Sequence, residues 1–165
     1  FARLPDPDLK INNIANTMSE VVSDYENDNK NIKFINKLHS SQINVNMDNS
    51  QISRVFQNLI VNSIHSISES KNKDGEIIYS SYEVDDNIVL SIIDNGLGLK
   101  YEKEELIKPY FTTKKKVGGS GLGLAIVEKI LFDHHADFFL ENRNDGKVGA
   151  EVKIIFGKTI IWKIS

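Results

Sequence analysis

The sequence contains no cysteine, only three prolines and a single tryptophan among its 165 residues. Without cysteine the chain can form neither a disulfide framework nor a cysteine-ligated metal site, which fits a cytoplasmic setting. No apolar run approaches the roughly 20 residues that a membrane-spanning helix needs. The formal net charge of -3 provides no basic surface, so we expect no nucleic-acid partner.

What is present is enough apolar material for one compact domain, since 40% of the residues are hydrophobic and 26% are charged. Apolar residues recur at helical spacing over 11–25, 50–69 and 121–135, which predicts three helices. Alternating or continuous apolar runs predict strands over 32–38, 43–47, 77–84, 87–94, 136–142 and 149–156. In this reading Ser50 caps the long second helix, and the polar stretch from 100 to 120 is a long loop.

This order of elements predicts an α/β fold, in which a mixed, mostly antiparallel sheet forms one layer of a two-layer sandwich. About three helices would cover one face of the sheet, because each amphipathic helix must bury its apolar stripe. We assign residues 1–10 to a linker at the end of a preceding helical region and residues 11–157 to the domain itself. Residues 158–165 form a tail whose role the sequence leaves open, and the opening "FARLPDPDLK" reads as the middle of a longer protein.

The long helix carries two asparagines beside its apolar sector. Asn58 and Asn62 are four residues apart and therefore lie one above the other on the helix. A solvated helix face is the simpler interpretation of the pair taken alone. The alternative is a cation site, because amide oxygens suit Mg²⁺, which also keeps waters and phosphate oxygens as ligands. His65, one turn further on, would then face a phosphate, although an exposed histidine is the commoner case.

Two glycine clusters follow. "DNGLGL" begins with Asp94 at a strand end, where a carboxylate can accept a hydrogen bond from the amine of adenine; a plain turn is the alternative. "GGSGLGL" opens a helix, whose free N–H groups favour an anion such as a triphosphate. A P-loop is excluded because Leu124 and Ala125 stand where Lys and Ser or Thr are needed. A dinucleotide fingerprint is excluded because Leu124 replaces its last glycine and no strand precedes it.

"QNLIVNSIHSI", "DNGLGL", "PYFTTK" and "GGSGLGL", in this order, resemble the N, G1, F and G2 boxes of sensor histidine kinases. Their catalytic ATP-binding domain belongs to a superfamily shared with DNA gyrase B, Hsp90 and MutL. The resemblance extends over roughly 48–156, and "FARLP" resembles the end of the dimerisation helices in nitrogen-regulation sensor kinases. The fold that it implies is the sandwich described above (a Bergerat-type ATP-binding fold) with a long ATP lid.

The resemblance implies an ATP site whose residues can be named from the matching boxes. Asn62 and Asn58 would bind Mg²⁺, and Asp94 would read the adenine. The remaining ATP-binding residues implied are His65, Gly96, Gly98, Leu99, Phe111, Thr112, Thr113, Lys114, Gly119, Ser120, Gly121, Leu122 and Gly123. Many family members have Thr where Ala150 stands, so no hydroxyl contact is expected there.

Asn58 also bears on the reaction class. ATP hydrolases of the superfamily typically carry a general-base glutamate four residues before the metal-binding asparagine, and an amide cannot take up that proton. The resemblance therefore implies transfer of the γ-phosphate to a histidine of the dimerisation domain, because no histidine of this chain lies in a phosphoacceptor-type sequence. A response regulator would receive the phosphate next. The parent is expected to be a homodimer, membrane-anchored, with this domain in the cytoplasm.

Two rival functions remain open within the same superfamily. One is an ATP-hydrolysing clamp or chaperone domain, against which Asn58 speaks. The other is a serine kinase that acts on an anti-sigma partner.

Overall fold

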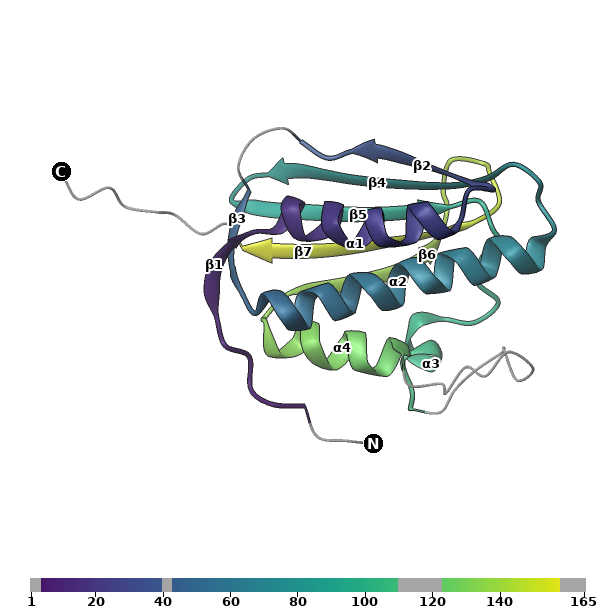
Figure 1. The fold of residues 1–165 in the computed structure, drawn as a ribbon. Coiled ribbons are helices and arrows are strands. Elements are labelled where there is room, and N and C mark those ends of the chain that lie inside the picture. The colour runs from purple at the N-terminus through teal and green to yellow at the C-terminus, as the bar shows by residue number, and fades with distance from the viewer. Residues whose placement is uncertain (1–3, 40–42, 110–122, 158–165) are drawn as a thin grey trace.

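The structure, a computed structural model, describes residues 4–39, 43–109 and 123–157 (Figure 1). The elements in these ranges are, in chain order, β1 (Lys10–Asn13), α1 (Ile14–Asp28), β2 (Ile32–Lys37), β3 (Asn44–Met47), α2 (Asn49–Ser70), β4 (Gly75–Val84), β5 (Asn87–Asp94), α3 (Lys103–Leu106), α4 (Gly123–Asp133), β6 (Asp137–Asn142) and β7 (Ala150–Gly157). The strand predicted for 87–94 is confirmed at both ends, and the one predicted for 136–142 begins one residue later, at Asp137. Both are short apolar runs rich in β-branched or aromatic residues.

Five strands form the main sheet in the order β2-β4-β5-β7-β6. The β2–β4 pair is parallel, and the three other pairs are antiparallel. The predicted mixed, mostly antiparallel sheet is therefore confirmed. Strand β3 does not join it, since β3 pairs with β1 in a separate two-stranded sheet. The sequence could not show this, because β2 and β3 have the same alternation although they belong to different sheets.

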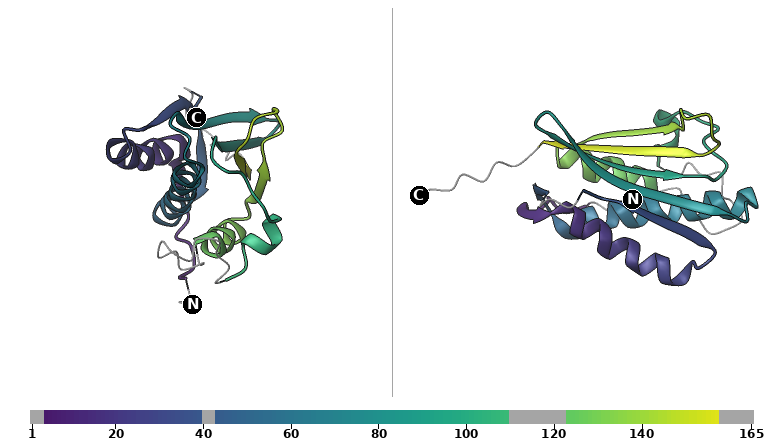
Figure 2. Two further views of the ribbon diagram at one scale, coloured as in Figure 1. Left: turned by 90° about the vertical axis from the view of Figure 1, so that its right-hand side faces the viewer. Right: turned by 90° about the horizontal axis from the view of Figure 1, so that it is seen from above.

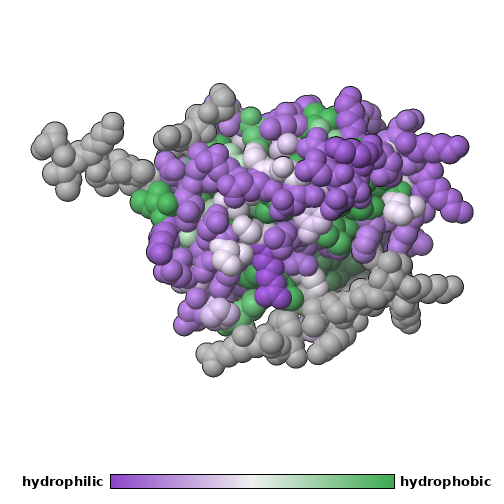
Figure 3. All heavy atoms as spheres, in the orientation of Figure 1, coloured by the Kyte–Doolittle hydropathy of each residue, from purple (hydrophilic) through white to green (hydrophobic). Residues whose placement is uncertain are grey.

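Helices α1, α2 and α4 cover one face of the main sheet, as predicted (Figure 2). The apolar sector of α2 is buried in the core between them: Ile52, Val55, Phe56, Leu59, Ile60 and Ile67 are each at most 2% exposed. The outer surface of this helical layer is mostly hydrophilic (Figure 3). No helix in the described parts of the chain is long and apolar enough to cross a membrane.

Two predicted helix starts were wrong. Helix α1 begins at Ile14 rather than at residue 11, because 10–13 pair with β3 and Asn13 caps the helix through its side chain. Helix α2 is capped by Asp48, not by Ser50, and the Asp48 carboxylate accepts the N–H of Gln51 at 3.1 Å. The long loop predicted from residue 100 contains the short helix α3.

Asp48 also ties three parts of the chain together. Its second carboxylate oxygen accepts the N–H of Asp8 at 2.9 Å. Its own N–H donates to Nε2 of His134, at the end of α4, at 3.0 Å. His134 is 8% exposed, and its Nδ1 lies 2.8 Å from the carbonyl oxygen of Ile130. His134 therefore has a structural role at the C-terminal end of α4.

Candidate functional site

One polar stripe on α2 organises the site. Asn58, Asn62 and Ser66 follow one another at intervals of four residues, so their side chains project from the same side of the helix. At 1.5 Å per residue, the stripe is about 12 Å long. Asn58, Asn62 and Ser66 are all half-buried. We call these three residues the α2 stripe.

The Asn58 end of the α2 stripe faces the beginning of α4. The Asn58 amide donates through Nδ2 to the carbonyl oxygen of Arg54, on its own helix, at 2.9 Å. The amide oxygen is directed away from this bond: a Cβ placed on Gly123 would lie 3.1 Å from Oδ1 of Asn58. The helix that carries the two asparagines and the end of the second glycine cluster therefore meet here, although 65 positions separate Asn58 from Gly123.

The Ser66 end of the α2 stripe holds the loop 94–99, which follows β5. The Leu97 N–H donates to Oγ of Ser66 at 2.9 Å. A Cβ on Gly96 would overlap Ser66, so only glycine lets the loop backbone approach the helix this closely. The same helix thus contacts the carboxylate-bearing loop at one end and the start of α4 at the other.

Asp94 is a buried carboxylate with fixed backbone donors. Its side chain is 5% exposed, and Oδ1 accepts the N–H of Gly96 at 2.9 Å and that of Ala150 at 3.4 Å. Burial raises the pKa of Asp94, and this outweighs the opposing effects of the two N–H groups, the Ser63 hydroxyl and Arg143. Such a carboxyl group in a hydrogen-bonded, shielded position is typical of a binding site.

Two residues behind the loop 94–99 were missed by the sequence analysis. Arg143 donates through Nη1 to the carbonyl oxygen of Asp94 at 3.2 Å and also binds the Asp145 carboxylate at 2.6 and 3.1 Å. Asn142 binds Leu99 twice: Oδ1 accepts the Leu99 N–H at 2.6 Å, and Nδ2 donates to the Leu99 carbonyl oxygen at 3.1 Å. In the sequence both residues only precede a turn, so no local signal marks them.

Gly149 completes this side of the site. Its φ is +143°, and a Cβ there would overlap the carbonyl oxygen of Asp94. The Gly149 carbonyl oxygen accepts the Arg143 N–H at 3.1 Å. The glycine before the last strand is the one available sequence signal for this contact, because a close backbone approach requires it.

The structure brings part of the predicted site together. Asp94, Gly96, Gly98 and Leu99 lie in the loop beside the C-terminal half of α2, whereas Gly123 lies against Asn58. His65 is on α2, three residues after Asn62, and is half-buried. Eight further predicted residues lie outside the described residues: Phe111, Thr112, Thr113, Lys114, Gly119, Ser120, Gly121 and Leu122.

The donor set at the α2 stripe suits a hard cation that is shared with phosphates. Asn58 and Asn62 provide amide oxygens, and the described residues contain no group of three or more His, Cys, Asp or Glu side chains that could hold a metal alone. Mg²⁺ is commonly bound by few protein oxygens, with waters and substrate phosphates as the other ligands. The residues present therefore fit a nucleotide-associated Mg²⁺.

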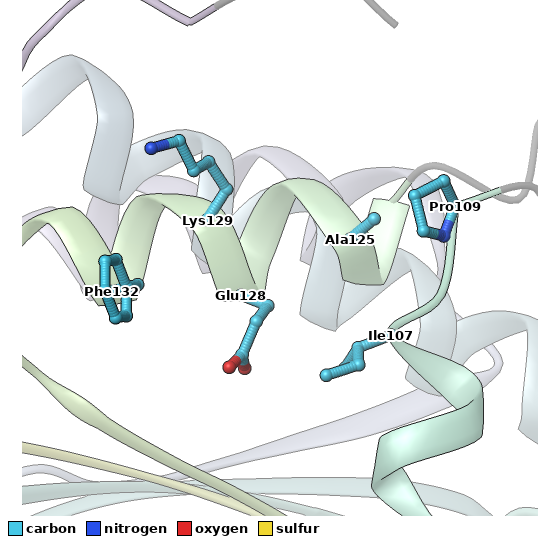
Figure 4. A pocket seen from close by; sticks show the side chains of 6 residues that line it. All are labelled: Ile107, Pro109, Ala125, Glu128, Lys129 and Phe132. Atoms are coloured by element: carbon cyan, nitrogen blue, oxygen red, sulfur yellow. The ribbon is translucent and has the colours of Figure 1, made fainter.

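A separate groove of about 270 Å³ lies between α4 and the segment 107–109 that follows α3 (Figure 4). Its lining residues are Ile107, Pro109, Ala125, Glu128, Lys129 and Phe132. Phe132 is 72% exposed, and Glu128 lies 3.6 Å from the ammonium group of Lys103. Of the predicted site residues within the described parts of the chain, none lines this groove.

Comparison with known families gives a match over most of the chain. The family described as "Histidine kinase-, DNA gyrase B-, and HSP90-like ATPase" matches residues 47–160. Among curated relatives, the nitrogen regulation protein NtrY of Azorhizobium caulinodans is 29% identical over 93% of this chain, and a putative NtrY-like sensor histidine kinase of Rickettsia bellii is 31% identical over 94%. The chain spans 20% and 25% of the length of these two relatives.

Solved structures agree with the sequence match. The catalytic domain of the histidine kinase ThkA superposes with a TM-score of 0.78 at 27% identity, covering 92% of this chain and 96% of that domain. ThkA in complex with the response regulator protein TrrA superposes with a TM-score of 0.75 at 25% identity, covering 93% of this chain and 42% of that one. The α/β sandwich is thus the fold of a histidine kinase catalytic domain.

Proposed function

The chain belongs to the family of histidine kinase-, DNA gyrase B- and HSP90-like ATPases, and from this premise we propose that it is the catalytic ATP-binding domain of a sensor histidine kinase. It binds Mg²⁺-ATP and transfers the γ-phosphate to a histidine on a dimerisation domain outside this chain. The observation that carries the proposal is that α2 contacts both the Asp94 loop, through Ser66, and Gly123, through Asn58.

The base-binding end of this site is the loop 94–99. Asp94 accepts a hydrogen bond from the adenine amine. Gly96 and Gly98 lack a Cβ and so allow the loop backbone to approach the flat base closely. An ionised carboxylate selects adenine over guanine, because guanine has a carbonyl acceptor at the corresponding position. Leu99, half-buried in the same loop, adds apolar contact to the base.

The phosphate end lies at the other end of the α2 stripe. Asn62 and Asn58 hold Mg²⁺ through their amide oxygens, and His65 approaches a phosphate. The metal, when bound, neutralises charge on the transferring phosphoryl group. Gly123 and the preceding Gly119, Ser120, Gly121 and Leu122 contribute backbone N–H groups to the phosphates, and Phe111, Thr112, Thr113 and Lys114 belong to the lid.

Transfer to a side chain suits this site better than hydrolysis does. Asn58 occupies the position at which a hydrolase would need a general base, and its amide already donates to Arg54. The domain would therefore position ATP and leave the attacking group to the histidine of the dimerisation domain. The parent would act as a homodimer that passes the phosphate to a response regulator, with this domain on the cytoplasmic side of a membrane-anchored kinase.

Titration calorimetry with a non-hydrolysable ATP analogue and Mg²⁺ tests the binding step. We expect saturable binding that requires Asp94, and an absence of binding to the wild-type chain would overturn the proposal.

The transfer step requires the parent kinase, incubated with γ-labelled ATP. Acid-labile, base-stable phosphate on the dimerisation domain supports histidine phosphorylation. Acid-stable phosphate on a separate protein would favour the serine kinase instead. Steady release of inorganic phosphate by the domain alone would favour the hydrolysing clamp.

A further inference from the structure

The loop 94–99 is held from two opposite sides by the side chains of Ser66 and Asn142, to which the family resemblance assigns no role in the site. On one side Ser66 of α2 accepts the Leu97 N–H at 2.9 Å. On the other side Asn142, at the end of β6, accepts the Leu99 N–H at 2.6 Å and donates to the Leu99 carbonyl oxygen at 3.1 Å. The loop is thus attached to the helical layer and to the sheet at two residues only two positions apart.

The glycines of the loop fit this arrangement closely. A Cβ on Gly96 would overlap Ser66, and a Cβ on Gly98, whose φ is +78°, would lie 2.8 Å from Oδ1 of Asn142. Each glycine therefore faces one of the two polar side chains. At these two glycines, the spacing between helix, loop and sheet is set by small groups that meet through hydrogen bonds.

We propose that Ser66 and Asn142 are positioning residues that hold the loop 94–99 in the shape that reads adenine. This inference rests on the proposed nucleotide-binding function and deepens it. Asp94 can discriminate between bases only if its carboxylate and the glycine backbone keep a fixed separation. A loop anchored at Leu97 and Leu99 keeps that separation, because Oδ1 of Asp94 accepts the N–H of Gly96, a residue of the same loop, and that of Ala150.

The inference makes a specific prediction about base selectivity. Loss of either anchor should weaken the binding of ATP much more than the binding of a purine nucleoside triphosphate without the 6-amino group. A general loosening of the fold would weaken the binding of both nucleotides alike. The ratio of the two affinities therefore separates a positioning role from a merely structural one.

The experiment compares Asn142→Ala, Asn142→Asp and Ser66→Ala with the wild-type chain by calorimetry against both nucleotides. Asn142→Ala and Ser66→Ala should reduce the ATP affinity and the affinity ratio by about three- to tenfold, as expected for the loss of one or two neutral hydrogen bonds. Asn142→Asp keeps the acceptor for Leu99 N–H but loses the donor, and it should give an intermediate ratio. Ser66→Ala keeps the space that Gly96 needs.

Asn144→Ala is the matched control, because Asn144 is an exposed asparagine in the same β6–β7 turn. Its affinity ratio should equal that of the wild type. If Asn142→Ala and Ser66→Ala keep the wild-type ratio while the wild type binds ATP, the inference is wrong and the proposed function stands. If the wild type binds ATP and the analogue equally well, Asp94 does not read the amine and the inference is wrong. If the wild type binds neither nucleotide, the proposed function is overturned.

Discussion

The two ends of the α2 stripe are built differently. At the Ser66 end, the loop 94–99 is bound by Ser66, Asn142 and Arg143, and its carboxylate is almost fully buried. At the Asn58 end, the described hydrogen bond of the asparagine goes to its own helix. The amide oxygen is left facing Gly123. The base end is therefore organised in advance by the protein, whereas the phosphate end offers oxygens that a cation and phosphates would complete.

The difference has a physical reason. Base selection needs a carboxylate at a fixed position, and a rigid loop supplies it without an ordering cost at binding. Mg²⁺ keeps several of its water ligands and also binds phosphate oxygens, so two amide oxygens at the correct spacing are enough to hold it at the phosphate end. The comparison predicts that substitutions at the base end change the free energy of unfolding as well as nucleotide binding, while those at the phosphate end change metal-dependent binding alone.

The largest effect, on the free energy of unfolding, is expected for Gly149→Ala, because Gly149 packs against the backbone of Asp94 at the base end. The new Cβ would overlap the Asp94 carbonyl oxygen at a backbone angle that L-residues rarely adopt. We expect a loss of about 3 kcal/mol in the free energy of unfolding, measured by urea denaturation. Gly146→Ala is the control: its φ is also positive, at +79°, but no atom lies within 4 Å of the added Cβ. It should cost only about 1 kcal/mol; equal losses would show that Gly149 matters for its φ alone.

Asp94→Asn should have the next largest effect, on nucleotide binding. The substitution removes a charge-assisted hydrogen bond to the adenine amine and places a donor opposite it, so ATP affinity should fall about 10- to 100-fold. Calorimetry with an ATP analogue measures this loss. Asp137→Asn, an exposed change on β6, serves as the control. An unchanged ATP affinity in Asp94→Asn would show that Asp94 does not bind the adenine base.

Asn62→Ala addresses the phosphate end and should affect only binding that requires the metal. We expect about tenfold weaker binding of ATP in Mg²⁺ and little change in EDTA, because one of few protein ligands is lost. The free energy of unfolding should change little, in contrast with Gly149→Ala. Gln57→Ala, an exposed change on the same helix, is the control. Equal weakening with and without Mg²⁺ would mean that Asn62 does not bind the cation.

The smallest expected effect is on the pH dependence of stability. The pKa of Asp94 is raised by burial, so its favourable contribution is present below the unfolded pKa of about 3.9 and is lost as the pH rises through the folded value. Asp94→Asn should therefore unfold less readily than the wild type at neutral pH, although it binds ATP poorly. The two proteins should converge in acid. Urea denaturation across the pH range measures the difference.

Asp48 provides the opposite case. Burial raises its pKa, but the N–H groups of Asp8, Gln51 and Ser50 outweigh burial and leave the pKa lowered. Its contribution is present above the unfolded pKa of about 3.9 and is lost as the pH falls through the folded value. Asp48→Asn, which keeps a good capping side chain, should thus be slightly less stable than the wild type at neutral pH. Parallel pH profiles for the two variants would contradict the assigned pKa directions.

The sequence by itself determined the fold class, most strand and helix ranges, and the chemical types of the site. Periodicities of 2 and 3.6 and the position of Asp94 at a strand end are local properties, and local properties survive in a one-dimensional pattern. The tertiary structure alone decided that β3 pairs with β1. It also brought Ser66, Asn142, Arg143 and Gly149 around one loop. Those contacts join residues far apart in the chain, and hydrogen bonds between distant polar groups leave no periodic trace in the sequence.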